Sequence, residues 1–408
     1  MSEYQYYEFR AIDRPLGQEE MDELRTLSTR AEITPTSFIN MYHWGDFKGD
    51  PAALMDRYFD AFVYVANWGT RRLMFRIPRR FLDVEAASAY CNEEELSLKP
   101  GKEHVVLEFS SEDESGDEWT EGEHLMSSLI SLRSELMRGD SRALYLGWLA
   151  SLWSRDGDEE DGSDHEDDRD EEDGRDDQDL DDDRLEPPVP PGLAKLSAPL
   201  QALADFLRVG NELIEVAAAG SVGEPPAEPS RTELARWVQG LPATDKDGYL
   251  LRFLAVEGDL LLRAELSKRF RESTAPKGAR PAPDAARRTV AQLLAARDVL
   301  LEEKMRKATE LAARERAIRE REQTEARARY LDDLARRESA TWREVEDLIA
   351  KKLPKEYDRA VTLLVNLRDL AGRSGRTAEA EARIQGIRQR HSSKPSLMKR
   401  FDAKKLGK

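Results

Sequence analysis

The stretch 42–50 reads Tyr-His-Trp-Gly-Asp-Phe-Lys-Gly-Asp and holds the residue types best suited to acid–base chemistry. A histidine beside an aspartate at a strand end can act as a general acid–base pair, so His43 and Asp46 are the candidate catalytic residues. Neighbouring positions in a sequence do not guarantee contact, and a turn with a hydrogen-bonded histidine explains the same string. We predict such a turn and keep an enzyme centred on this pair as the lowest-ranked hypothesis.

Other catalytic and ligand-binding patterns are absent from the sequence. Gly45 and Gly49 enclose Lys48, but neither the phosphate-loop pattern nor the dinucleotide fingerprint occurs. Cys91 is the single cysteine and the five histidines are scattered, which argues against a zinc site. Neither candidate calcium-binding loop is complete: the run at 156–161 lacks the glycine, and the loop that contains Gly248 has Ala243 and Leu254 at its first and twelfth positions. The sequence therefore predicts no cofactor and no metal, with Cys91 as a packed thiol.

Charge is distributed unevenly along the 408 residues, whose net charge is −18. Residues 156–186 hold 20 acidic and 3 basic side chains, whereas residues 284–408 hold 21 acidic and 31 basic ones. An acidic run of this kind cannot bury apolar surface, so we predict a disordered acidic and Pro-rich linker at 155–191. The alternative is a docking segment for a basic partner or for the basic tail of this chain.

The elements that would position these residues indicate an α+β protein. An N-terminal mixed α/β domain is predicted at 1–154, with element order βαβαββαβ and two more helices at 124–153. Alternating and continuous apolar patterns place its strands and helices. The predicted strands lie at 4–12, 33–44, 61–66, 71–77 and 104–109, and the predicted helices at 18–31, 51–59 and 83–91. Asp50 is the expected N-cap of the second helix, with Pro51 at its first position.

The remainder is predicted to be mainly helical. A helical region is expected at 192–283 and a basic helical hairpin with its tail at 354–408. Between them, residues 284–353 contain neither glycine nor proline and predict one long charged helix, a possible coiled coil. Charged residues interrupt its apolar heptad positions, so the seam is weak. The candidate partner-binding residues on it are Leu294, Leu301, Leu311 and Ile318.

The C-terminal tail is the candidate nucleic-acid contact. Residues 373–408 carry 11 basic and 3 acidic side chains, and such a concentration of cations can hold phosphates. The candidate residues are Arg383, Arg388, Arg390, Lys394, Lys399 and Arg400.

Two groups of residues resemble known families. The strings at 4–9, 11–16, 42–51, 66–69, 186–193 and 202–207 resemble an uncharacterised bacterial protein family. Residues 357–401 resemble the C-terminal helical segment of bacterial SWIM-type zinc-finger proteins. The residues that carry this second resemblance are Tyr357, Ala360, Leu363, Leu364, Leu367, Leu370, Ala371, Gly375, Glu381, Ala382, Arg383, His391, Lys394 and Pro395. The zinc ligands of those proteins are missing here, so the resemblance implies neither zinc nor SWIM-type nucleic-acid binding.

These observations favour a non-enzymatic interaction or scaffold protein of a bacterial cytoplasmic complex. Its partner would be another protein, or a second copy bound through the long helix. The alternative is a nucleic-acid-associated protein that binds through the basic C-terminal hairpin. No stretch reaches the roughly 18 apolar residues of a spanning helix, and the first 30 residues lack a secretory signal, so no membrane contact is expected.

Overall fold

A computed structural model gives the structure of the chain, and its fold class is α+β, as predicted. It describes residues 4–92, 94–113, 122–153, 183–221, 223, 229–255, 259–274 and 287–407. The chain forms two compact units, residues 1–302 and 303–408, with the boundary inside one long helix. Residues 154–182, which include most of the predicted linker, lie outside the described part.

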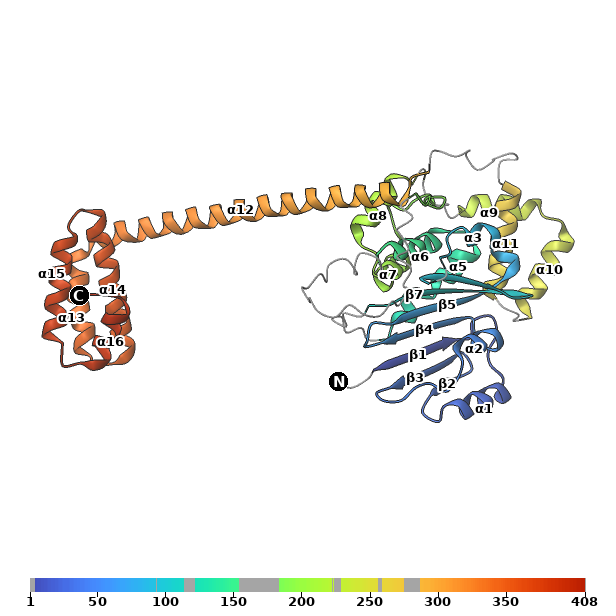
Figure 1. Ribbon diagram of the computed structural model, residues 1–408, viewed down its shortest axis with the longest axis horizontal. Helices are drawn as coiled ribbons and strands as arrows, with labels where there is room; N and C mark the ends of the chain where they lie inside the picture. The colour runs from blue at the N-terminus through green and yellow to red at the C-terminus, as the bar shows by residue number, and fades with distance from the viewer. Residues whose placement is uncertain are drawn as a thin grey trace, which may run out of the picture. The chain divides into compact units, whose positions relative to one another are not determined.

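The first unit is built on a seven-stranded sheet in which every neighbouring pair is antiparallel. Its strand order is β2-β3-β1-β4-β5-β7-β6, so the first strand lies inside the sheet (Figure 1). The strands are β1 (Gln5–Arg10), β2 (Glu32–Thr34), β3 (Ser37–Tyr42), β4 (Ala61–Ala66), β5 (Arg71–Pro78), β6 (Leu96–Pro100) and β7 (His104–Ser111).

Two details of the predicted sheet are wrong. The single strand expected at 33–44 is the hairpin β2–β3, because the chain turns between Thr34 and Ser37. Strand β6 was not predicted. It is an edge strand of five residues that ends in Pro100, and among the described residues it pairs with β7.

Strand β4 lies at the centre of the apolar core. All six of its residues are buried, as its uninterrupted apolar sequence predicts. On one face, Phe9, Phe38 and Phe62 pack beneath helices α1 (Gln18–Leu27) and α2 (Pro51–Arg57). The expected cap of α2 is confirmed, because Asp50 accepts a hydrogen bond of 2.9 Å from the backbone of Ala52.

Helices from both sides of the acidic run cover the other face of the sheet. They share one core with Leu73, Phe75 and Phe109. The helical elements here are η1 (Arg79–Phe81), α3 (Val84–Ser88), α4 (Leu125–Leu129), α5 (Ser131–Met137), α6 (Arg142–Trp153), α7 (Ala198–Phe206) and α8 (Asn211–Ala219). The domain boundary predicted at 192 is therefore not a boundary between cores.

The buried carboxylate of Glu186 joins the segment before α7 to the segment before α12 (Val290–Arg336). Glu186 is almost fully buried, accepts a hydrogen bond from Tyr145 and forms two contacts of 2.8 Å with Arg288. An antiparallel bridge between Leu185 and Thr289 extends this contact. Residues 183–191 were predicted to be the end of a disordered linker, but they are packed within the first unit.

Three further helices follow in the first unit, namely α9 (Arg231–Gly240), α10 (Ala243–Leu254) and α11 (Asp259–Thr274). Helix α11 contacts α5 and η1 and carries the buried residues Leu262, Ala264 and Phe270. Neither α9 nor α10 has a buried residue. This pair is therefore attached to the unit mainly through α11.

The second unit is a helical bundle. Its elements are the end of α12 (Val290–Arg336), then α13 (Glu338–Ala350), α14 (Pro354–Arg373), α15 (Thr377–Arg390) and α16 (Pro395–Ala403). The sequence leaves open whether the long charged helix at 284–353 is continuous, and the structure divides it at Arg337, which has φ −120° and ψ 21°. This break allows Leu334 of α12 and Trp342 of α13 to join the same core. The predicted hairpin is confirmed as α14 and α15, and α16 is an additional helix.

The turn between β4 and β5 yields a stability prediction. Gly69 has φ +99°, and a Cβ atom there would lie 1.8 Å from the backbone oxygen of Asp113. We expect Gly69→Ala to lower the free energy of unfolding by about 2 kcal/mol or more, through backbone strain and the clash. Urea unfolding followed by circular dichroism measures this loss. Gly240→Ala is the control, since its Cβ meets open space. Equal stability of the two variants would contradict the described turn.

Candidate functional site

The two predicted catalytic residues, His43 and Asp46, have different partners in the structure. Asp46 accepts a hydrogen bond of 3.1 Å from the side chain of Gln5, and the ring of His43 lies 6.1 Å from that of Tyr4. Both candidates are exposed in the segment after β3. Among the described residues, no hydrogen bond or ion pair links His43 to Asp46. The geometry thus gives no acid–base pair at this turn.

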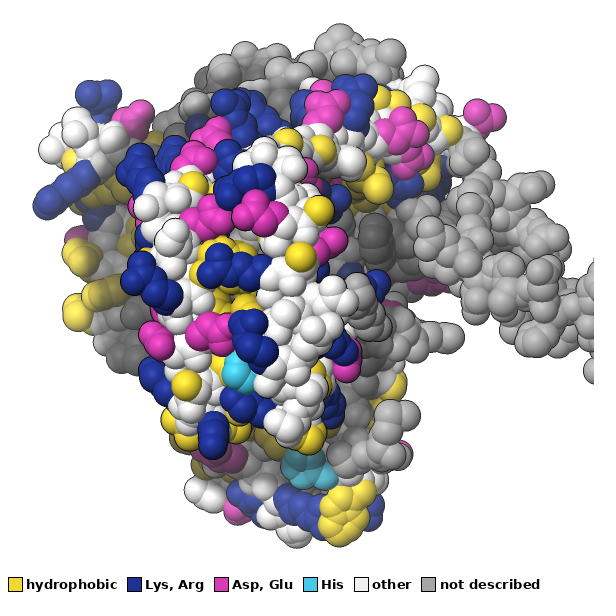
Figure 2. All heavy atoms as spheres, turned by 90° about the vertical axis from the view of Figure 1, so that its left-hand side faces the viewer, with side chains coloured by type: hydrophobic (Ala, Val, Ile, Leu, Met, Phe, Trp, Pro, Cys, Tyr) yellow, Lys and Arg dark blue, Asp and Glu magenta, His cyan; other side chains and the backbone are white. Residues whose placement is uncertain are grey.

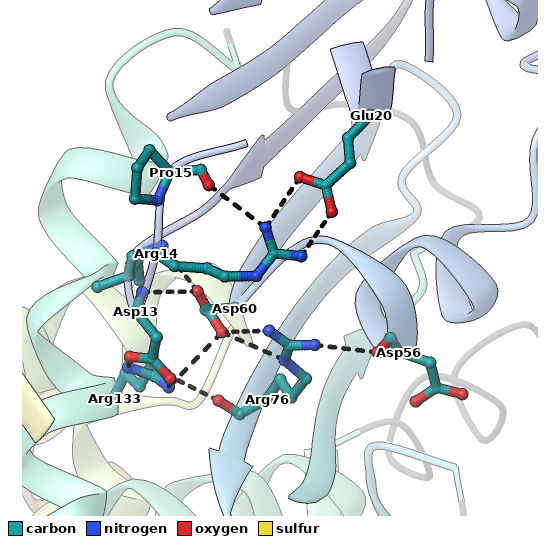
Figure 3. A network of polar contacts seen from close by, with 9 residues as sticks. Asp13, Arg14, Pro15, Glu20, Asp56, Asp60, Arg76 and Arg133 are labelled. Atoms are coloured by element: carbon teal, nitrogen blue, oxygen red, sulfur yellow. Dashed lines mark hydrogen bonds and ion pairs between the residues drawn. The ribbon is translucent and has the colours of Figure 1, made fainter. Parts of the chain in front are cut away.

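The most deeply buried group of ionisable residues is one that sequence reasoning missed (Figure 3). Asp60 lies between α2 and β4, Arg76 on β5, Arg133 on α5 and Asp13 just after β1. Arg76 contacts Asp60 at 2.8 Å, and Arg133 holds both oxygens of Asp13, at 2.8 and 2.7 Å. We call these four residues the buried charge network.

Every guanidinium nitrogen in the buried charge network has a partner. Arg133 also donates to the carbonyl of Arg76 at 2.8 Å, and Arg76 donates to the carbonyl of Asp56 at 2.9 Å. Backbone N–H groups of residues 12 and 13 donate to the second oxygen of Asp60 at 2.7 and 2.8 Å. Arg133 is only 2% exposed. The ionised groups of the network thus bind one another and the backbone inside the fold, so its chemistry is that of a structural tie.

Opposing effects act on the Asp60 carboxyl group. Burial disfavours its charged form, but Arg133, Arg76 and the backbone donors outweigh burial and lower its pKa. Asp60 is therefore ionised in the folded protein at neutral pH. No sequence motif marks it, although an aspartate immediately before a fully apolar strand is a weak signal.

The candidate residues on the long helix have two different environments. Leu294 packs against the core of the first unit and Leu301 is half-buried, whereas Leu311 and Ile318 are 58% and 49% exposed. Residues 305–327 of α12 are all exposed. Ion pairs between residues four positions apart lie along this stretch, including Glu315 with Arg319 at 3.1 Å. Such pairs stabilise a helix that is surrounded by solvent.

Most candidate nucleic-acid residues of the tail already have partners within the second unit. Arg388, Arg390 and Arg400 pair with Asp402, Glu346 and Asp358. The guanidinium of Arg383 lies 4.4 Å from the ring centroid of Trp342, and Lys394 donates to the carbonyl of Ile349 at 3.2 Å. Lys399 is exposed. Figure 2 shows basic and acidic side chains interleaved on the face nearest the viewer.

Helix α10 is a second feature that the sequence analysis missed. Its polar side faces α11, where Asp245 contacts Arg269 at 2.6 Å and Arg252 holds both oxygens of Glu265. Tyr249 accepts a further hydrogen bond of 2.6 Å from Arg269. Its apolar side is open to solvent. The side chains there, which we call the α10 apolar face, are Leu250, Leu251, Phe253 and Leu254, with exposed fractions of 56–72%.

A hollow of about 670 Å³ lies on the second unit between α12 and the end of α14. Its basic lining residues, Arg327 and Arg373, pair with Asp369 and Asp332. Leu331 is buried at its base. The basic side chains that line the hollow are therefore compensated from within the bundle.

Comparisons with known proteins supply no relative. No protein-family model, curated protein or solved structure matches this chain. The two resemblances noted from the sequence stay predictions. Among the described residues, none of the helices has the length and apolar character needed to cross a membrane, and no cluster of His, Cys, Asp and Glu could hold a metal ion.

The buried charge network yields the next prediction. We expect Asp60→Asn to lower the free energy of unfolding at pH 7 by about 3–5 kcal/mol, since Arg76 and Arg133 lose a buried counter-ion. Denaturant unfolding at several pH values measures the loss. The matched control is Asp56→Asn, because the Asp56 side chain is exposed and contributes only its backbone carbonyl.

The pH dependence of this loss follows from the lowered pKa of Asp60. Its stabilising contribution is fully present above about pH 5 and is lost as the pH falls below about 4, the usual value for an unfolded aspartate. The stability difference between wild type and Asp60→Asn should shrink over that range. A difference that stays constant down to pH 3 would contradict the assigned role.

Proposed function

We propose that the protein is a non-enzymatic interaction or scaffold protein of a bacterial cytoplasmic complex. The observation that carries this proposal is the inverted orientation of α10. A helix on the surface of a globular protein normally turns its apolar side inward and its charges outward. Here the charges of Asp245 and Arg252 are tied to α11, and the α10 apolar face meets solvent.

Energetic reasoning supports a partner for this face. Complete burial of a leucine or phenylalanine side chain contributes about 1.5–3 kcal/mol. The four side chains of the α10 apolar face are each more than half exposed, so covering them would contribute several kcal/mol. Contiguous apolar surface of this kind on a folded protein is typical of interaction sites.

The candidate enzyme residues offer no competing site. His43 and Asp46 have separate partners, and the buried charge network is satisfied internally. The apolar positions Leu311 and Ile318 on α12 are a second possible contact, and self-association through the long helix stays a prediction. An experiment that separates α10 from α12 therefore tests the proposal.

Site-specific photocrosslinking in the cytoplasm tests it directly. We expect a crosslinking amino acid at Leu251 to yield covalent adducts with protein, because this side chain is 67% exposed on the α10 apolar face. The same group at Leu311 reports on α12, and at Glu19, an exposed position of α1, it provides the background. Adducts at neither Leu251 nor Leu311 above that background would overturn the proposal.

A nucleic-acid-associated function is the second candidate, and the charge of the second unit favours it. Residues 303–408 hold 28 Lys and Arg against 18 Asp and Glu. Lys352 and Lys355 are exposed where α13 meets α14, and Lys399 is exposed on α16. These lysines, rather than the paired arginines of the tail, are the side chains suited to hold phosphate.

Replacement of these lysines tests the second candidate better than removal of the tail, because α15 and α16 belong to the bundle core. If the protein binds nucleic acid, Lys→Glu at 352, 355 and 399 should weaken binding and reduce the salt dependence by about one unit of slope per lost phosphate contact. Fluorescence anisotropy with a labelled oligonucleotide measures both. Matched Lys→Glu changes at the exposed positions 48, 99 and 102 of the first unit are the control. Binding without salt dependence, or none, would rule this function out.

A further inference from the structure

We infer that the α10 apolar face binds the same face of a second copy of this chain. This inference rests on the proposed interaction function and names its partner. It proceeds from the exposed side chains of α10, from the charges around them and from the area that they offer.

The local packing fixes α10 with this side outward. Arg269 holds Asp245 and Tyr249, and Glu265 holds both terminal nitrogens of Arg252 at 3.0 and 2.9 Å. Rotating the helix to bury its leucines would break all of these contacts and expose the polar side of α11. The outward orientation is therefore a property of the folded unit, with α10 labelled in Figure 1.

The spacing of the apolar residues suits contact between two helices. Leu254 lies four residues after Leu250 and three after Leu251, so it is a neighbour of both on the helix surface, and Phe253 borders them. Such a row packs into the same row of an antiparallel helix. A two-fold axis near Leu251 would make the contact self-complementary, as in most protein dimers.

The charges at the border are compatible with a second copy. Arg252 and Asp245 are already compensated by α11, so neither introduces a net charge into the contact. Asp247 is exposed on the same side of the helix as Leu251, four residues before it, but an antiparallel pair centred on Leu251 places its two copies about eight helical residues, or roughly 12 Å, apart. That separation exceeds the screening length of roughly 8 Å at physiological salt.

The offered area is suitable for the centre of a modest interface. Four neighbouring side chains that are 56–72% exposed present a contiguous apolar surface on each copy. A standard interface buries about 800 Å² per partner, with an apolar centre and a polar border. The α10 apolar face therefore fits the apolar centre of such an interface.

Other occupants fit these observations less well. A nucleic acid requires unpaired cations, whereas Arg252 and Arg269 are engaged with carboxylates. A membrane surface requires a helix whose basic polar side faces the lipid headgroups, but the polar side of α10 is bound to α11. Both occupants are outcomes that the experiment can detect.

Size-exclusion chromatography with light scattering on the full chain tests the inference. We expect the mass to rise from 46.4 kDa toward twice that value as the concentration increases from about 1 to 200 µM. Leu251→Asp should weaken the dimer by about 100-fold or more. Leu353→Asp is the matched control and should leave the dimer unchanged, since Leu353 is an exposed leucine that belongs to neither the α10 apolar face nor the candidate contact on α12.

A charge-swap experiment tests the two-fold contact itself. Leu251→Asp and Leu251→Lys chains should each remain monomeric, and an equimolar mixture of them should recover a dimer, because the two positions 251 face each other. Circular dichroism melts matching wild type show that both variants fold. A wild-type chain that stays monomeric at 200 µM, or a dimer that Leu251→Asp leaves intact, overturns the inference.

The two proposals fail in distinguishable ways. A monomeric wild-type chain that still forms adducts with another protein through position 251 in the cell would refute the second-copy contact and retain the interaction function. Binding of the purified chain to vesicles or oligonucleotides, lost in Leu251→Asp while the chain stays monomeric, would overturn the second-copy contact in favour of that ligand. Absence of both dimer and adducts would refute both.

Discussion

The ion pairs of one buried carboxylate, Asp60, hold the first unit together. Its oxygens accept hydrogen bonds from the backbone after β1 and pair with the guanidinium groups of Arg76 on β5 and Arg133 on α5, so one residue connects the sheet to a helix that covers it. Such a group is stable in a dry interior only when each charge is paired and each hydrogen bond is formed. The loop after β1, the start of β4 and the position of α5 are therefore fixed together.

The same principle appears at Glu186, on the other side of the core. Tyr145, Arg288 and the bridge between Leu185 and Thr289 secure the chain where it re-enters the fold and where α12 begins. Segments about 100 residues apart in the sequence thus share one buried acid. Arg288 also donates to the carbonyls of Val216 and Ala217 on α8, and apolar packing places the helices from 198–219 in the core of the N-terminal sheet.

Ion pairs nearer the surface determine which charged and apolar side chains remain open to solvent. In the second unit the arginines of the tail pair with carboxylates of α13, α14 and α16, so a stretch that is strongly basic in sequence is partly neutralised within the bundle. On α10 the pairing with α11 leaves an apolar side open to solvent. The internal ion pairs of a small group of helices thereby determine which surface is available to a partner.

The sequence alone predicted the local elements well. Continuous apolar residues identified β4, the Asp50–Pro51 pair located the start of α2, and glycine turns and periodicity located the α14–α15 hairpin. These features depend on neighbours within a few positions. Strand order, the edge strand β6, the break at Arg337 and the buried charge network depend on residues that are distant in the sequence. Tertiary structure alone also decided which side of α10 faces outward. Its amphipathic pattern is the same in either orientation, and only the acids and bases of α11 select between them.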